Sequence, residues 1–224
     1  MIGAMPLFGT WLSILALFST GVLASAANDE LRWPARSHDR TGEPHCADAL
    51  PDGTRTLLGI RLNTDPGNLF VHVLGPSPGH GAGDAHSGRN WQCWAAANGD
   101  GTVLVVGGGE LVDEFEVLGR EMPFPARPTC ARSKLVSGKL ATANGLRIGI
   151  SRSDVEAKVG APSRAGNRWL QRTCNSRKPM TDEDRHAWKA PPGAQWDILS
   201  AMTALFDDAD RIVAFRVTWS SVGP

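Results

Sequence analysis

The fold prediction rests on the stretch VGGGELVDEFEV at residues 106–117. It aligns without gaps to FDDADRIVAFRV at residues 206–217, which lies 100 positions later. In both stretches a glycine-rich or polar turn is followed by alternating apolar positions, so that Phe115 matches Phe215. An apolar residue at every second position is typical of a strand with one buried face, and a turn between two such runs indicates a β-hairpin. Each stretch therefore predicts a hairpin.

A short helix is expected upstream of each hairpin. Before the first hairpin, Asp65 is a suitable N-cap, Pro66 suits the first helical position and Gly75 ends the apolar stripe. Before the second, Ser151 and Asp154 have the spacing of a capping box, in which a hydroxyl and a carboxylate each accept from a backbone N–H. The same order of elements thus occurs twice, which indicates an internal duplication.

The predicted fold class is α+β, with two tandem repeats that each contain helical segments followed by an antiparallel β-sheet. Repeat 1 covers residues 45–118 and repeat 2 covers residues 129–224. Residues 119–128 between them contain prolines without apolar periodicity, and we expect a stiff linker there. Repeat 2 is longer, with an insertion at about residues 176–196.

The four cysteines fit this division, because each repeat has one early and one late cysteine. Four cysteines allow three connectivities, and sequence alone does not normally choose between them. If each repeat closes on itself, the disulfides are Cys46–Cys93 and Cys130–Cys174. The prediction is therefore one disulfide per repeat.

The first 26 residues are expected to be a signal peptide. Residues 1–28 contain no charged side chain, residues 11–18 form an apolar block, and Ala24-Ser25-Ala26 is a small-residue cleavage site. The alternative is an uncleaved anchor, since about 18 apolar residues can span a bilayer. Residues 27–44 form a polar leader. We expect a periplasmic or secreted protein without stable membrane insertion after signal cleavage.

The charge balance excludes some classes of partner. The chain has 23 basic and 23 acidic residues, so its formal net charge is zero. This argues against nucleic-acid binding, which depends on attraction to phosphates, and against a polybasic membrane-surface protein. No nucleotide-binding, zinc-protease or hydrolase motif is present, and we expect no cofactor.

One loop has residues that could bind a metal ion. His80, Asp84 and His86 could supply three ligands to zinc or copper. The glycines among them favour the other interpretation, which is a loop that joins a helix to a strand.

Part of the second repeat resembles a known family. The string Gly149–Val155, with Gly160 and Pro162 behind it, resembles the helix-entry motif of bacterial envelope proteins of the BamE/SmpA type. It is also similar to each half of the secreted β-lactamase inhibitory protein. The resemblance covers residues 140–219 well and 57–118 loosely. It implies helices followed by an antiparallel sheet whose surface binds proteins, and no catalytic residue carries over.

The predicted function is an exported, non-catalytic protein-binding or inhibitory module of the bacterial cell envelope. The alternatives are an envelope enzyme, such as a hydrolase with a site in the cleft between the repeats, and a scaffold that acts through dimerisation. Tryptophan and arginine are enriched at binding hot spots. We therefore expect the insertion to contact a protein partner through Arg177, Arg185, Trp188 and Trp196, although Trp188 could instead only cap the core.

Overall fold

The computed structural model describes residues 31, 33, 34, 46, 50–82, 89–122 and 129–223, with the backbone alone for residues 79–82 and 89. The chain divides into two units, Met1–Glu30 and Leu31–Pro224, and every described residue belongs to the second unit. The expected signal peptide at residues 1–26 and most of the polar leader therefore lie outside the described residues, as do residues 123–128 of the expected linker.

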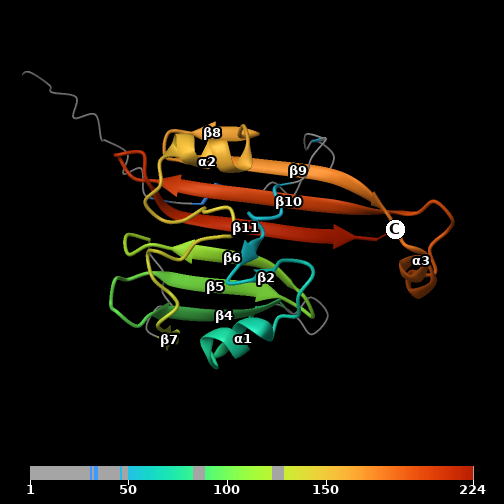
Figure 1. Ribbon diagram of the computed structural model, residues 1–224, viewed down its shortest axis with the longest axis horizontal. Helices are drawn as coiled ribbons and strands as arrows, with labels where there is room; N and C mark the ends of the chain where they lie inside the picture. Colours follow the sequence, from blue (N-terminus) through green and yellow to red (C-terminus); the bar gives the residue numbers. More distant parts are fainter. Residues whose placement is uncertain are drawn as a thin grey trace, which may run out of the picture. The chain divides into compact units, whose positions relative to one another are not determined.

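A single nine-stranded sheet dominates this unit (Figure 1). Its strands pair antiparallel, except that β7 (Ala131–Ser133) runs parallel to β4 (Arg89–Ala96). The other eight follow the order β3 (Gly79–Ala82), β4 (Arg89–Ala96), β5 (Val103–Gly108), β6 (Val112–Leu118), β11 (Ile212–Val222), β10 (Gln195–Phe206), β9 (Trp169–Pro179) and β8 (Arg164–Gly166).

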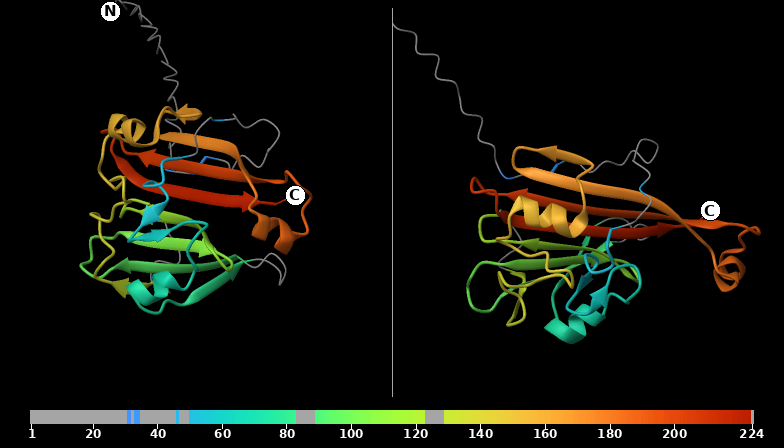
Figure 2. Two further views of the ribbon diagram at one scale, coloured as in Figure 1. Left: turned by 45° about the vertical axis from the view of Figure 1, so that its right-hand side comes forward. Right: turned by 45° about the horizontal axis from the view of Figure 1, so that its top comes forward.

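The remaining described elements are short. Strands β1 (Thr56–Leu57) and β2 (Ile60–Arg61) form a separate hairpin. Helices α1 (Leu69–Leu74) and α2 (Arg152–Val159) bury Phe70, Leu74, Val155 and Val159 in the main core, and α3 (Asp182–Trp188) lies between β9 and β10 (Figure 2). No helix within the described ranges is long and apolar enough to cross a membrane.

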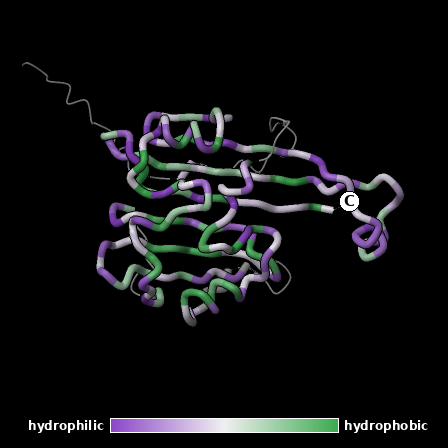
Figure 3. The backbone as a smooth tube through the Cα atoms, in the orientation of Figure 1, coloured by the Kyte–Doolittle hydropathy of each residue, from purple (hydrophilic) through white to green (hydrophobic). Residues whose placement is uncertain are grey.

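The two hairpins indicated by the alternating pattern are present, as β5–β6 and β10–β11. They meet at the centre of the sheet, where Phe115 lies opposite Val217 and Val117 lies opposite Phe215. The rings of Phe115 and Phe215 contact edge to face with centroids 6.4 Å apart, and both are fully buried. Burying each such ring contributes about 1.5–3 kcal/mol. Hydrophobic residues follow these central strands in Figure 3.

The predicted fold class is wrong. Among the described residues, strands make up 44% and helices 14%, so this part of the protein is mostly β. The strands of the two expected repeats join through β6 and β11 into one continuous sheet, so neither half is a closed α+β unit. The physical reason is that an exposed strand edge presents unpaired N–H and C=O groups. When β6 pairs with β11, the backbone N–H and C=O groups along both strand edges become hydrogen-bonded. The alternation of apolar residues within a strand does not determine which other strand it pairs with.

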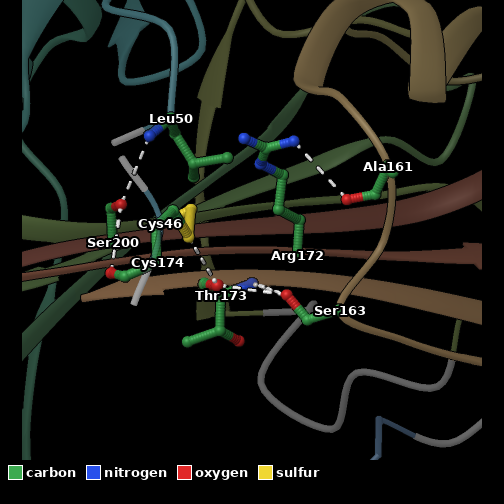
Figure 4. The surroundings of a disulfide bond; sticks show 8 residues. All are labelled: Cys46, Leu50, Ala161, Ser163, Arg172, Thr173, Cys174 and Ser200. Atoms are coloured by element: carbon green, nitrogen blue, oxygen red, sulfur yellow. Dashed lines mark hydrogen bonds between the residues drawn. A yellow bond between two sulfur atoms is a disulfide. The ribbon is translucent and has the colours of Figure 1, made fainter. Parts of the chain in front are cut away.

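The predicted disulfide pairing is also wrong. The bonds are Cys46–Cys174, which Figure 4 shows, and Cys93–Cys130. Both connect the two expected repeats. Cys130 directly precedes β7, and the pairing of β7 with β4 brings it beside Cys93. No cysteine is free. Two disulfides indicate an oxidising, non-cytoplasmic compartment.

The helix starts were predicted correctly for α2 but not for α1. Ser151 and Asp154 form the expected capping box at the start of α2. Helix α1 instead begins after Asn68, and Asp65 accepts a hydrogen bond from the backbone N–H of Arg61 at 2.7 Å. Pro66 cannot begin this helix because it forms a β-bridge with Leu111.

Candidate functional site

The predicted insertion forms the outer part of the β9–β10 hairpin, and we call residues 175–199 the arm. Strands β9 and β10 pair from Pro179 opposite Gln195 to Trp169 opposite Leu205. Strand β6, in contrast, pairs with β11 only from Ala214 to Thr218. The arm therefore continues past the end of this central pairing, and Figures 1 and 2 show α3 at its free end.

Helix α3 is fixed by caps at both ends. Thr181 accepts from the backbone N–H of Asp184, and the Asp184 carboxylate accepts from the N–H of Thr181, which is a complete capping box. Such a cap contributes about 1 kcal/mol. At the other end, Lys189 adopts the left-handed conformation with a φ of 50°, and its backbone N–H donates to the carbonyls of Arg185 and His186. A seven-residue helix is thus held on the arm without burying any of its own residues.

Two tryptophans form a small cluster at the end of the arm. The Trp188 and Trp196 rings contact edge to face, with centroids 5.3 Å apart. Trp196 is half-buried and donates from Nε1 to Oδ2 of Asp184 at 3.2 Å. Trp196 covers only part of Trp188, and Trp188 is 61% exposed. Trp196 therefore anchors the helix, while Trp188 presents most of its indole to the outside.

The arm should loosen in acid because of Asp184. Hydrogen bonds from the Thr181 hydroxyl, the Trp196 indole and the Thr181 backbone hold its pKa below the ordinary value of 3.8. A lowered folded-state pKa means that this stabilisation is complete above about pH 4 and is lost as the pH falls through the folded-state pKa. We expect the near-ultraviolet circular dichroism of the tryptophan pair to fade only below about pH 4.

The Asp184→Asn variant is the comparison for this titration, because it has no carboxylate to protonate. Its tryptophan signal should not change between pH 5 and pH 2, while the Glu183→Gln variant should behave as the wild type. An equal loss of signal in all three proteins would show that the acid transition does not involve Asp184.

The structure brings together three of the four predicted partner-binding residues. Arg185, Trp188 and Trp196 all belong to the end of the arm, and Arg185 also forms an ion pair with Asp182. Arg177 lies on the strand that carries α3, where it pairs with Asp197 at 3.1 Å. Their role in binding remains a prediction.

The predicted metal ligands are not assembled by the described residues. His80 belongs to β3, and Asp84 and His86 lie outside the described residues. Across the part of the chain that the structure describes, no three His, Cys, Asp or Glu residues form a group that could hold a metal ion.

A second feature was missed by the sequence analysis. A hollow of about 540 Å³ lies beside α1 and the β5–β6 turn. From the sequence, the three consecutive glycines Gly107–Gly109 indicate a turn here but not a binding site. The residues that line the hollow are Pro66, Gly67, Asn68, Val71, His72, Asn90, Gln92, Val106, Gly107, Gly108, Gly109, Glu110 and Val112.

Two titratable side chains line the hollow. It contains one imidazole, that of His72, and one carboxylate, that of Glu110, and both residues are exposed. None of the lining residues is a serine, threonine or cysteine that could act as a nucleophile. The hollow offers hydrogen-bonding groups over an apolar surface, which is the composition of a binding site.

Compared with protein-family models, with curated proteins and with solved structures, this chain gives no match.

Proposed function

We propose that this protein is an exported, non-catalytic binding or inhibitory module of the bacterial cell envelope that contacts a protein partner through the end of its arm. The observation that carries the proposal is Trp188, a large apolar side chain that is 61% exposed on a fixed helix. Tryptophan is among the residues most often found at the centre of binding interfaces. The disulfides support a role outside the cytoplasm.

The position of Trp188 favours binding over simple capping of the core. A tryptophan that only closes the core would have its ring covered, as the ring of Trp94 is covered at 0% exposure. Trp188 instead sits on a helix that buries none of its residues. The capping box, the left-handed cap and the contact with Trp196 fix its orientation before any partner arrives, which reduces the ordering cost of binding.

Charged residues of both signs surround Trp188. The exposed Lys189 follows it directly, and the exposed Lys178 lies across the strand pair from Trp196. The first turn of α3 carries Asp182, Glu183 and Asp184, so the arm presents charges of both signs. The partner in this proposal is therefore a folded protein that is defined by an apolar pocket for the indole. Arg177 and Arg185, which already have carboxylate partners, are expected to contribute less than Trp188.

Replacing Trp188 by alanine should abolish capture of the partner while leaving the fold intact. Loss of a hot-spot tryptophan weakens binding by about 2 kcal/mol or more, which is on the order of 30-fold. The measurement is quantitative capture from the native envelope by immobilised wild type and variant, followed by the affinity of the purified partner. The matched control is Leu135→Ala, because Leu135 is 50% exposed on a loop outside the arm.

Three results would contradict the proposal. The first is equal affinity of the wild type and the Trp188→Ala variant for the captured protein. The second is an equal loss with Leu135→Ala, which would indicate nonspecific adhesion. The third is that a photoreactive residue at position 188 crosslinks only to another copy of this chain, which would favour the scaffold alternative.

A further inference from the structure

The hollow beside α1 has a rigid frame. The backbone N–H of Asn63 donates to the carbonyl of Val112 at 2.6 Å, and the N–H of Val112 donates to the carbonyl of Asp65 at 3.2 Å. The N–H of Gly67 donates to the carbonyl of Glu110 at 3.2 Å. These bonds fasten the segment before α1 to the β5–β6 turn, so the rim of the hollow is held on both sides.

Helix α1, which forms one wall, is also fixed. Phe70 is fully buried against Trp94, with ring centroids 6.4 Å apart. The Trp94 indole donates from Nε1 to the carbonyl of Gly75, the C-cap of α1, at 2.9 Å. These contacts hold the wall of the hollow in place, and its volume of about 540 Å³ lies within the range of known ligand sites.

The hydrogen-bonding groups of the hollow are mainly carboxamides. Asn68, Asn90 and Gln92 line it, and their side chains make no hydrogen bond within the part of the chain that the structure describes. Asn90 and Gln92 are two residues apart on β4 and thus share one face of the sheet. Each carboxamide offers both donors and an acceptor, which matches the donor and acceptor of a peptide group.

The apolar part of the hollow is small and aliphatic. Val71, Val106 and Val112 line it, and none of its lining residues is a phenylalanine, tyrosine or tryptophan. A sugar commonly stacks on an aromatic ring, whereas a small aliphatic side chain packs well against valines. We therefore infer that the hollow binds a short peptide segment, whose backbone amides bond to Asn90 and Gln92 and whose small apolar side chain packs against the three valines. This site is separate from the arm and does not depend on it.

The test uses the capped residue N-acetylvaline methylamide, which has two peptide groups and one small apolar side chain. Titrated into the ¹⁵N-labelled protein, it should shift the side-chain amides of Asn90 and Gln92 and the backbone amides of Gly107–Gly109. The shifts should saturate, with half-saturation on the order of a few millimolar, as expected for a ligand of this size. Methyl glucoside at the same concentrations should not shift these resonances.

Two variants locate the site. Gln92→Met removes one carboxamide and keeps the length of the side chain, and it should weaken binding about fivefold. Gln195→Met makes the same change on the arm and should leave binding unchanged. Gly109→Val should narrow the hollow, because Gly109 lines it and a Cβ at this position meets no atom within 4 Å.

Other outcomes would overturn the inference. These are the absence of saturable shifts at the hollow, equal or tighter binding of methyl glucoside, and unchanged half-saturation in both Gln92→Met and Gly109→Val. The Trp188→Ala variant should bind the probe as the wild type does. If the arm binds no partner, binding of the probe at the hollow is unaffected. If the hollow binds no probe, the proposal for the arm is likewise unaffected.

Discussion

Replacing both Cys46 and Cys174 by alanine should lower the free energy of unfolding by about 5 kcal/mol, the largest effect expected for any change in this protein. The two cysteines are 128 residues apart, so their bond removes much of the conformational freedom of the unfolded chain. Because whole domains are stable by only about 5–15 kcal/mol, the variant should be largely unfolded at 37 °C. Denaturation in guanidinium, followed by tryptophan fluorescence, measures the loss.

Removing this bond should also weaken the packing of the folded protein around it, in addition to its effect on the unfolded chain. Cys174 is fully buried in β9, and Cys46 lies four residues before Leu50, which is 2% exposed. The N–H of Leu50 donates to the Ser200 hydroxyl at 3.4 Å (Figure 4). Without the disulfide, Cys46 loses its covalent link to β9, and the hydrogen bond of Leu50 to Ser200 on β10 remains.

The second disulfide is the internal control. Cys93 and Cys130 are only 37 residues apart, so removing that bond should cost about 4 kcal/mol, about 1 kcal/mol less than the first. An equal or greater loss for the Cys93–Cys130 pair would show that loop length does not set the difference between the two bonds.

The local elements of this fold were predictable from the sequence because their causes are local. The alternation in residues 106–117 and 206–217 predicts strands, and the structure has the two hairpins there. The capping box at Ser151 begins α2, and Thr181, a suitable N-cap, begins α3. In each case the residues that determine the element lie within a few positions of it.

The arrangement of these elements was not predictable in the same way. The pairing of β6 with β11 depends on backbone groups that every strand has, so no side-chain pattern marks it. The disulfide pairing failed for a related reason. Cys130 meets Cys93 only because β7 adds to the edge of β4, and a three-residue strand leaves no periodic signal.

The candidate sites show the same contrast. The arm was found because an insertion rich in tryptophan and charge is visible in the sequence. The hollow was not found because its carboxamides come from Asn68 on one side and Asn90 and Gln92 on the other, and only the packing of α1 against β4 brings them together.

Replacing Arg216 by alanine should lower the free energy of unfolding by about 3 kcal/mol, the largest effect expected for a change outside the two disulfides. Arg216 lies opposite Glu116 in the central β6–β11 pair, with its Nε 2.5 Å from Oε1 of Glu116 and 3.4 Å from Oε1 of Glu114. The Glu114 side chain is 0% exposed and that of Arg216 is 13% exposed. Removing the arginine takes away the positive charge that compensates two buried carboxylates, and such a loss is costly in a medium of low dielectric.

A second ion pair in the same sheet provides the matched control. Arg177 and Asp197 also lie opposite each other on paired strands, but their side chains are 66% and 56% exposed. Arg177→Ala should therefore cost less than about 1 kcal/mol, because water screens an exposed pair. Similar losses for Arg177→Ala and Arg216→Ala in urea denaturation would mean that burial does not set the strength of the central pair.

The Arg216→Lys variant separates the charge from the shape of the side chain. The guanidinium of Arg216 lies 4.4 Å from the centroid of the Trp33 ring while its Nε faces both carboxylates. A lysine keeps the positive charge but lacks the planar group that can stack on an indole and bond two carboxylates together. Arg216→Lys should therefore recover only part of the stability lost in Arg216→Ala. Full recovery would show that charge alone stabilises the centre of the sheet.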